Sequence, residues 1–341
     1  MTYRIAKAKL DELFACLASF GDCYLPVDDE NGESHFRKWE NGTKLSENLN
    51  TVRSAKDFFF PQVQNLADFK VNGKNIEVVD NRKESEDFVV FGVRGCDRAG
   101  FEVLDRVFLA EPIDTCYKTR REHATIITMA CAKPAETCFC KTFGIDCTKP
   151  GGDVEAHLTN EYLYLEAVSE KGNALLARLA DILEECGREE IDEADAKTKS
   201  IMEALPLYNL EFKDMTGEQL DALKSPEWAK LSEACLGCGT CTFVCPTCQC
   251  YDVRDFDMGN GEIRRFRCWD SCMYSDFTLM AHGNPRVSQL ERFRQRFMHK
   301  LVYYPRNNDG IYGCVGCGRC LKKCPISMNI VKVMKKVGGD K

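Results

Sequence analysis

A cysteine pattern that occurs twice constrains this chain more than any other feature. The spacing C-x2-C-x2-C-x3-C-P begins at residue 235 and again at residue 314. Three thiols at this spacing on a curling loop can converge on three irons of one [4Fe–4S] cube, as they do in bacterial-type ferredoxins. Gly239 and Gly318 follow the second cysteine of each copy and allow a close backbone approach where a Cβ atom would collide. The sequence therefore predicts two [4Fe–4S] clusters.

The proline after each fourth cysteine predicts a crossed pairing of the ligands. It ends the loop and turns the fourth cysteine away, so that this cysteine reaches the other cluster. The first cluster would be held by Cys235, Cys238, Cys241 and Cys324. The second cluster would be held by Cys314, Cys317, Cys320 and Cys245. Structural zinc is the alternative, but zinc sites use paired CxxC knuckles around one ion, and this spacing fits them poorly.

Composition limits the class of protein further. A chain of 341 residues with 21 cysteines is more consistent with metal ligation or catalysis in a reducing compartment than with disulfides. The net charge of −7, with both signs interspersed, argues against nucleic acid as a partner. No segment approaches the roughly 20 apolar residues of a membrane span. The N-terminal segment lacks the apolar core of a signal peptide. We therefore expect a cytoplasmic protein without membrane insertion.

Residues 1–186 have the pattern of an α/β domain. Segments 87–97 and 123–131 are rich in β-branched and aromatic residues and are bounded by polar turns, which is typical of buried strands. Between them, apolar residues recur at helical spacing, namely Phe101, Leu104, Val107 and Phe108. Strand, helix and strand in this order predict a crossover unit with two parallel strands.

Further helices are predicted on both sides of this unit. Apolar residues recur at helical spacing over residues 5–17 and 173–187. Residues 187–230 are acidic and helix-prone, which predicts a helical linker. Residues 231–341 would then form a mainly helical, ferredoxin-like domain that binds the two clusters. In it, residues 289–304 predict an amphipathic helix, and we expect its basic residues to lie mainly on a solvated surface. These basic residues are Arg292, Arg294, Arg296 and Lys300.

Four more cysteines lie in or near the predicted crossover unit. Cys96 ends the first strand, Cys131 ends the second, and Cys138 and Cys140 follow in the next loop. Parallel strands end at the same edge of a sheet, where α/β proteins usually place their sites. The four thiols could therefore hold a third [4Fe–4S] cluster. The alternative is that Cys96 and Cys131 are ordinary buried apolar residues.

The remaining motifs leave the third site open. A rival ligand set draws on Cys248, Cys250 and Cys272, which could instead pack around the first cluster. The other cysteines are expected to be structural: Cys16, Cys23, Cys116, Cys147, Cys186 and Cys268. No GxGxxG fingerprint follows a strand and no P-loop is present, so the sequence shows no NAD or ATP site of its own.

Several segments together resemble one known family. They are GVRGCDRAGFEVLDRVF, CFCKTFG, CLGCGTCTFVCPTCQCYDV, RCWDSCMYSDFT and CVGCGRCLKKCPISMNI. Over about residues 55–335 the chain resembles the iron–sulfur subunit that anaerobic sulfite reductase shares with cytoplasmic sulfhydrogenase, a NiFe hydrogenase in which it is the beta subunit. The NPR and RFRQRFMHK segments look more like the hydrogenase-type branch.

The resemblance implies a function and partners. It implies a subunit that relays electrons between a flavoprotein subunit, which binds FAD and oxidises NAD(P)H, and a separate catalytic metalloenzyme subunit. We accordingly expect an electron-transfer subunit of an oxidoreductase complex without substrate chemistry of its own. The alternative is a self-contained reductase with a substrate or flavin site near Cys138 and Cys140.

Overall fold

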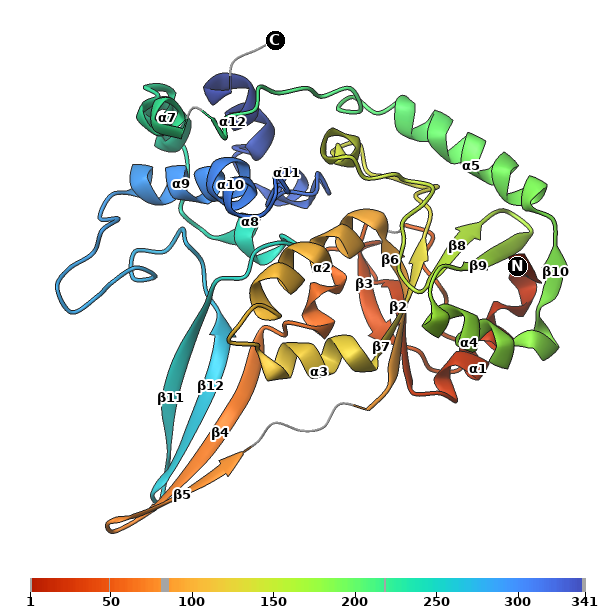
Figure 1. Ribbon diagram of the computed structural model, residues 1–341, viewed down its shortest axis with the longest axis horizontal. Coiled ribbons are helices and arrows are strands. Elements are labelled where there is room, and N and C mark those ends of the chain that lie inside the picture. Colours follow the sequence, from red (N-terminus) through yellow and green to blue (C-terminus); the bar gives the residue numbers. More distant parts are fainter. Residues whose placement is uncertain (1, 49, 81–85, 218, 339–341) are drawn as a thin grey trace.

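The computed structural model describes the chain except for residues 1, 49, 81–85, 218 and 339–341 (Figure 1). The N-terminal half is built around an eight-stranded sheet. Its strands are β1 (Thr2–Ala6), β2 (Asp22–Asp28), β3 (Ser34–Lys38), β6 (Phe88–Arg94), β7 (Ala124–Met129), β8 (Val154–Leu158), β9 (Tyr162–Ala167) and β10 (Glu184–Cys186). They lie in the order β10-β1-β9-β8-β7-β6-β2-β3, and the central strands β2, β6, β7 and β8 are parallel.

Helices cover both faces of this sheet. Apolar side chains of α1 (Leu10–Ala18) and α4 (Glu170–Arg178) pack on one face, where they meet Phe91 of β6. Apolar side chains of α2 (Gly95–Phe108) and α3 (Thr115–His123) pack on the other face, where they meet Val90 and Val93 of the same strand. A parallel strand that is buried on both faces reads as a nearly continuous apolar run, which is what residues 88–94 show.

The predicted crossover unit is confirmed, and two predicted helices are shorter than expected. β6 is followed by α2, then by the short helix α3 and by β7, and the two strands pair in parallel. Ile5, which fits the helical period, lies in β1 and pairs with Leu163 of β9. At the end of segment 173–187, residues 184–186 form β10 instead of continuing the helix. In both places a tertiary strand pairing outweighs the local helical pattern.

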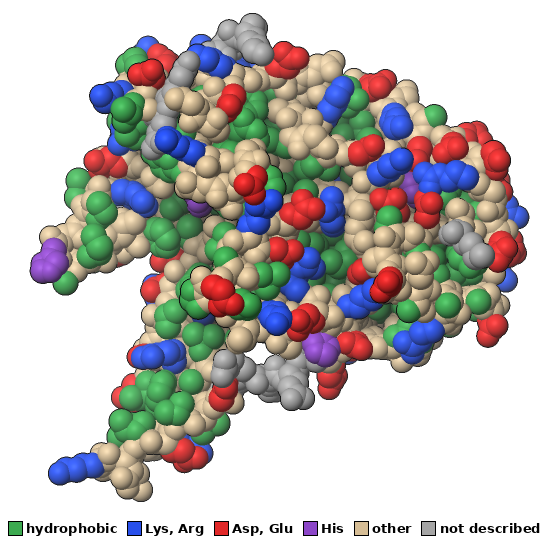
Figure 2. All heavy atoms as spheres, in the orientation of Figure 1, with side chains coloured by type: hydrophobic (Ala, Val, Ile, Leu, Met, Phe, Trp, Pro, Cys, Tyr) green, Lys and Arg blue, Asp and Glu red, His purple; other side chains and the backbone are tan. Residues whose placement is uncertain are grey.

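A second sheet pairs strands from the N-terminal and C-terminal parts of the chain. It consists of β4 (Val63–Asn72), β5 (Asn75–Asp80), β11 (Tyr251–Gly259) and β12 (Glu262–Trp269), in the antiparallel order β11-β12-β4-β5. It stands away from the body as an arm at the lower left of Figure 1, and Figure 2 shows apolar side chains on the visible face of the arm. Because two long strands lie within residues 231–341, the expectation of a mainly helical C-terminal domain is not confirmed.

The C-terminal part gathers its helices on one side of the eight-stranded sheet (Figure 1). They are α5 (Arg188–Glu203), α6 (Gln219–Lys224), α7 (Glu227–Glu233), α8 (Thr240–Phe243), α9 (Gln289–Met298), α10 (Tyr304–Asn307), α11 (Arg319–Lys323) and α12 (Ile330–Val337). A π-helical turn, His299–Tyr303, connects α9 to α10. Trp228, Phe293, Phe297 and Leu301 form the centre of a separate core here. No helix in the described ranges is both long and apolar enough to cross a bilayer.

A buried ion pair ties this part to the first sheet. Arg319 of α11 pairs with Asp97 of α2, and the two side chains are 2% and 0% exposed. The Arg319 Nη2 atom donates to Asp97 Oδ2 at 2.8 Å, and its Nε atom donates to the backbone oxygen of Thr51 at 2.8 Å. A buried charge is costly without its partner, so this pair holds two distant segments in one arrangement.

We predict that Asp97→Asn destabilises the chain, because it leaves the Arg319 charge buried and uncompensated. The expected loss in the free energy of unfolding is about 3–5 kcal/mol, which would appear as a lower midpoint in anaerobic urea unfolding followed by circular dichroism. Arg265→Ala, which breaks the exposed pair with Asp255, is the matched control and should leave the midpoint nearly unchanged. Equal midpoints for the two variants would show that the buried pair does not hold the fold.

Candidate metal centres

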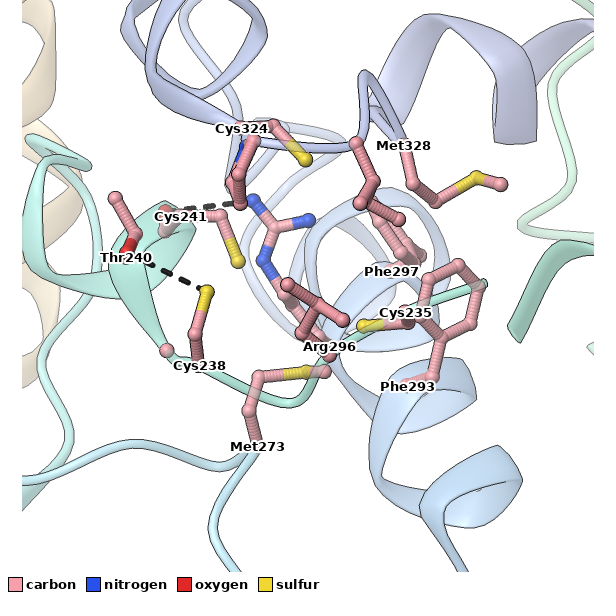
Figure 3. A pocket seen from close by; sticks show the side chains of 14 residues that line it. Cys235, Cys238, Thr240, Cys241, Met273, Phe293, Arg296, Phe297, Cys324 and Met328 are labelled. Carbon is pink, nitrogen blue, oxygen red and sulfur yellow. Dashed lines mark hydrogen bonds between the residues drawn. The ribbon is translucent and has the colours of Figure 1, made fainter. Parts of the chain in front are cut away.

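The first cysteine motif and the last cysteine of the second motif line one hollow (Figure 3). Its cysteines are Cys235, Cys238, Cys241 and Cys324, which is the set that the crossed pairing predicts. Met273, Phe293 and Phe297 supply an apolar wall on the side of α9. Four thiols in a largely apolar hollow are a suitable environment for an iron–sulfur cube.

Both motifs fold in the same way. In each, a glycine with positive φ immediately precedes a short helix that carries the third cysteine: Gly239 (φ 73°) before α8 and Gly318 (φ 74°) before α11. A Cβ atom at Gly239 would lie 2.9 Å from the Tyr274 ring, and one at Gly318 would lie 2.5 Å from the Thr137 oxygen. At these two glycines the backbone therefore comes close to other parts of the chain, namely to Tyr274 and to Thr137.

The fourth cysteine of the first motif belongs to the other group. Burial raises the pKa of Cys314 and Cys317, and for both the Cys245 thiolate raises it further. The Cys320 thiol is also influenced by Cys245. Lys300 links Cys245 to the start of the second motif, because its Nζ atom lies 3.3 Å from Cys245 Sγ and donates to the backbone oxygen of Gly313, the residue directly before Cys314.

The spacing of the sulfur atoms argues against zinc. Zinc–sulfur bonds of about 2.3 Å place the sulfurs of a zinc tetrahedron roughly 3.8 Å apart. Within the described part of the chain, no three cysteine sulfurs lie within 4.8 Å of one another. Thiolates on the corners of an iron–sulfur cube are farther apart, because each binds a different iron. The described cysteines are therefore not spaced as the ligands of a single tetrahedral zinc ion would be.

Two buried cations lie between the thiols. The Lys300 Nζ atom lies 3.3 Å from Cys245 Sγ and also donates to Thr247 Oγ1 at 2.7 Å. Burial lowers the pKa of Lys300, but the thiolates of Cys245, Cys248 and Cys314 together outweigh this effect and raise it. Arg296 donates to the backbone oxygen of Cys241, and its charge also acts on Cys320. Arg296 therefore lies between the two cysteine groups.

The expectation of a solvated basic helix surface is wrong for these two residues. Arg296 and Lys300 are only 3% and 5% exposed. They are four residues apart and share the face of the helix that also carries Phe293 and Phe297, which is the buried face. The positions of Arg296 and Lys300 relative to Phe293 and Phe297 already indicate this in the sequence, because a basic residue that shares the helical period of an apolar stripe faces the core.

The rival cysteines form a third set beside Lys300. Cys248 lies within hydrogen-bond reach of Cys245, and Cys250 lies within reach of Cys272. The hydrogen bond from Cys248 and the nearby Lys300 ammonium hold the pKa of Cys245 well below its ordinary value. Cys248, Cys250 and Cys272 line another hollow together with Lys300 and Arg296. They therefore lie beside Cys245, and Cys272 also acts on Cys241 of the first group.

The cysteines of the crossover unit lie elsewhere, at the edge of the eight-stranded sheet. Cys96, Cys131 and Cys140 pack in one buried cluster with Cys317 of the second motif. Cys138 contacts the backbone oxygen of Cys317. Arg94, which no sequence motif singles out, reaches into this set from the end of β6.

Comparison with known proteins agrees with this geometry. A family described as "4Fe-4S dicluster domain" matches residues 234–328, the segment that contains both motifs. Fold and site together define an α/β protein that carries an iron–sulfur dicluster domain.

The relationship extends over nearly the whole chain. It is 34% identical over 333 residues to "Sulfhydrogenase 2 subunit beta" of Pyrococcus furiosus, and the match covers 96% of this chain and 95% of that protein. The chain therefore belongs to the iron–sulfur subunit family that includes this beta subunit, as its motifs predict. No solved structure matches it.

We predict that Lys300→Met lowers the reduction potential of the second centre, because the lost positive charge no longer stabilises the extra electron. A unit charge several Å from a redox centre contributes roughly 2–4 kcal/mol at an effective dielectric constant near 20, so the expected shift is on the order of 100 mV. Anaerobic redox titration followed by EPR measures it. The reduction potential of Lys300→Arg should stay close to that of the wild type, because the charge is kept. A shift as large in Lys300→Arg as in Lys300→Met would contradict the role of the charge.

Proposed function

We propose that this chain is an electron-transfer subunit that passes electrons between an NAD(P)H-oxidising flavoprotein subunit and a separate catalytic metalloenzyme subunit. Two [4Fe–4S] clusters would supply the one-electron chemistry. Cys235, Cys238, Cys241 and Cys324 would hold the first cluster, and Cys314, Cys317, Cys320 and Cys245 would hold the second.

The observation that carries this proposal is the interlocking of the two cysteine groups. Cys324 of the second motif lines the hollow of the first motif, and Cys245 of the first motif lies beside Lys300 at the start of the second motif, so the two groups lie close together. Burial raises the pKa of Cys241, and Cys320 of the other group raises it further, so the groups influence each other electrostatically. Adjacent centres of this kind suit a path for electrons, whereas a structural staple needs only one closed metal site.

The surroundings of the first group support an exit toward a partner. Cys238 is exposed, and the neighbouring Leu236 side chain is 66% exposed. The arm adds further exposed apolar side chains, among them Phe256 and Ile76. Exposed apolar groups of this size commonly mark contact surfaces for other proteins. The first group therefore suits electron exchange with another subunit.

The burial of Cys138 and Cys140 favours a relay over a self-contained reductase. A substrate or flavin near these thiols would need an approach from solvent, but the two residues are 2% and 6% exposed. The backbone N–H of Phe139, between them, donates to the oxygen of Gly316 at 2.8 Å, so the loop is closed by the second motif. This packing suits an internal redox centre better than a substrate site.

We predict that the native protein, purified anaerobically, carries a flavoprotein and a catalytic metalloprotein as stoichiometric partners. Mass spectrometry of the complex and metal analysis would identify them. Nickel would indicate a hydrogenase-type partner, and sirohaem would indicate a sulfite-reductase type. The proposal fails if the chain purifies alone and reduces a substrate directly with NAD(P)H.

A further inference from the structure

A buried guanidinium contacts two of the four buried thiols of the crossover unit, those of Cys131 and Cys138. Arg94 is 2% exposed, and its Nε and Nη2 atoms each lie 3.4 Å from Cys131 Sγ. Its Nη2 atom also lies 3.6 Å from Cys138 Sγ. The Nη1 atom is buried and has no hydrogen-bond partner among the described residues. Among the described residues, the side chains that accept hydrogen bonds from Arg94 are those of Cys131 and Cys138.

This arrangement needs negative charge. Arginine stays protonated in proteins, and an uncompensated charge in the interior costs several kcal/mol. Four protonated thiols are neutral and would leave the guanidinium unbalanced. Four thiolates around a [4Fe–4S] core form an anion, which would balance it. The orphan Nη1 donor would also find an acceptor in the sulfur atoms of such a group.

We propose that Cys96, Cys131, Cys138 and Cys140 bind a third [4Fe–4S] cluster, with Arg94 as the cation that neutralises it. The four thiols are 4%, 5%, 2% and 6% exposed, which matches a closed and dry site. They come from the ends of two adjacent parallel strands and the loop that follows, so the sheet itself positions them. Arg94, the last residue of β6, lies two residues before Cys96, which is in the first turn of α2.

Cys147 is the nearest competitor as a ligand. Its backbone oxygen accepts a hydrogen bond from the Cys131 N–H at 3.0 Å, so it lies close to the site. However, it is only half-buried, and the thiols that act most strongly on the Arg94 charge are those of Cys131, Cys138 and Cys96. The geometry therefore favours Cys96 as the fourth ligand and leaves Cys147 outside the set.

The site lies directly against the second cysteine motif. Besides the hydrogen bond between Phe139 and Gly316, the Cys138 Sγ atom lies 3.8 Å from the backbone oxygen of Cys317. A Cβ atom at Gly316 would lie 2.4 Å from the Phe139 oxygen, so only glycine permits this approach. A third cluster here would be the neighbour of the second one. It would extend the path for single electrons from the first group, near the surface, toward the N-terminal sheet.

The inference rests on the proposed function, since it presumes a chain that assembles clusters, and the test separates the two. Iron and sulfide are measured per chain, under anaerobic conditions, in the full-length wild type and in four variants, one of which is Cys96→Ser. Cys138→Ser should lose about four irons relative to wild type and keep the EPR signals of the two other clusters. Cys147→Ser and Cys272→Ser, as matched controls, should retain the wild-type iron content.

The outcomes are distinct. Unchanged iron in Cys138→Ser overturns the third cluster, and a loss of about four irons only in Cys272→Ser transfers it to the rival set. A loss in Cys147→Ser, with none in Cys96→Ser, overturns the proposed fourth ligand. If Cys138→Ser does not fold by circular dichroism, Cys96→Ser replaces it, and about eight irons in wild type would still exclude the site. A wild-type chain without any iron would instead contradict the proposed function.

Discussion

Buried thiolates need positive charge beside them, and this requirement organises much of the molecule. Lys300 lies against Cys245, Arg296 lies between Cys241 and Cys320, and both are almost completely buried. Removing such cations from water is expensive unless anions face them. The helix that carries them thus has two roles, because its apolar side chains build the C-terminal core while its basic side chains face the sulfurs. Packing and electrostatics are provided by the same face.

The same region also joins the two halves of the chain. Arg319, one residue before Cys320, forms the buried ion pair with Asp97, one residue after Cys96. The glycines of the second motif allow the loop that carries Cys138 to lie directly on it. A segment that holds iron–sulfur ligands is therefore fixed by contacts with the N-terminal sheet. The two sheets and the C-terminal helices act as one support for the cysteine groups.

Much of this arrangement can be read from the sequence, and the failures have physical causes. The motif spacing predicts the fold of each cysteine loop, because local backbone geometry determines it, and the prolines predict that Cys324 lies with the first motif, as the structure shows. The apolar runs around Cys96 and Cys131 predict parallel strands correctly for the same reason. Ile5 fits a helical period but lies in a strand, since its pairing with Leu163 involves a segment far away in the sequence. The pairing of β4 with β12 is equally long-range, so the arm could not be predicted. Arg94 has no local signal at all.

The crossed pairing of the ligands is tested most directly by comparing four variants in the reduced, anaerobically purified protein. Cys238→Ser gives the reference EPR spectrum for an altered first cluster, and Cys317→Ser gives the reference spectrum for an altered second cluster. Cys268→Ser on the arm is the control. If the two motifs exchange their fourth thiols, the spectrum of Cys324→Ser matches that of Cys238→Ser, although Cys324 lies in the second motif. A Cys324→Ser spectrum that matches Cys317→Ser instead would contradict the account.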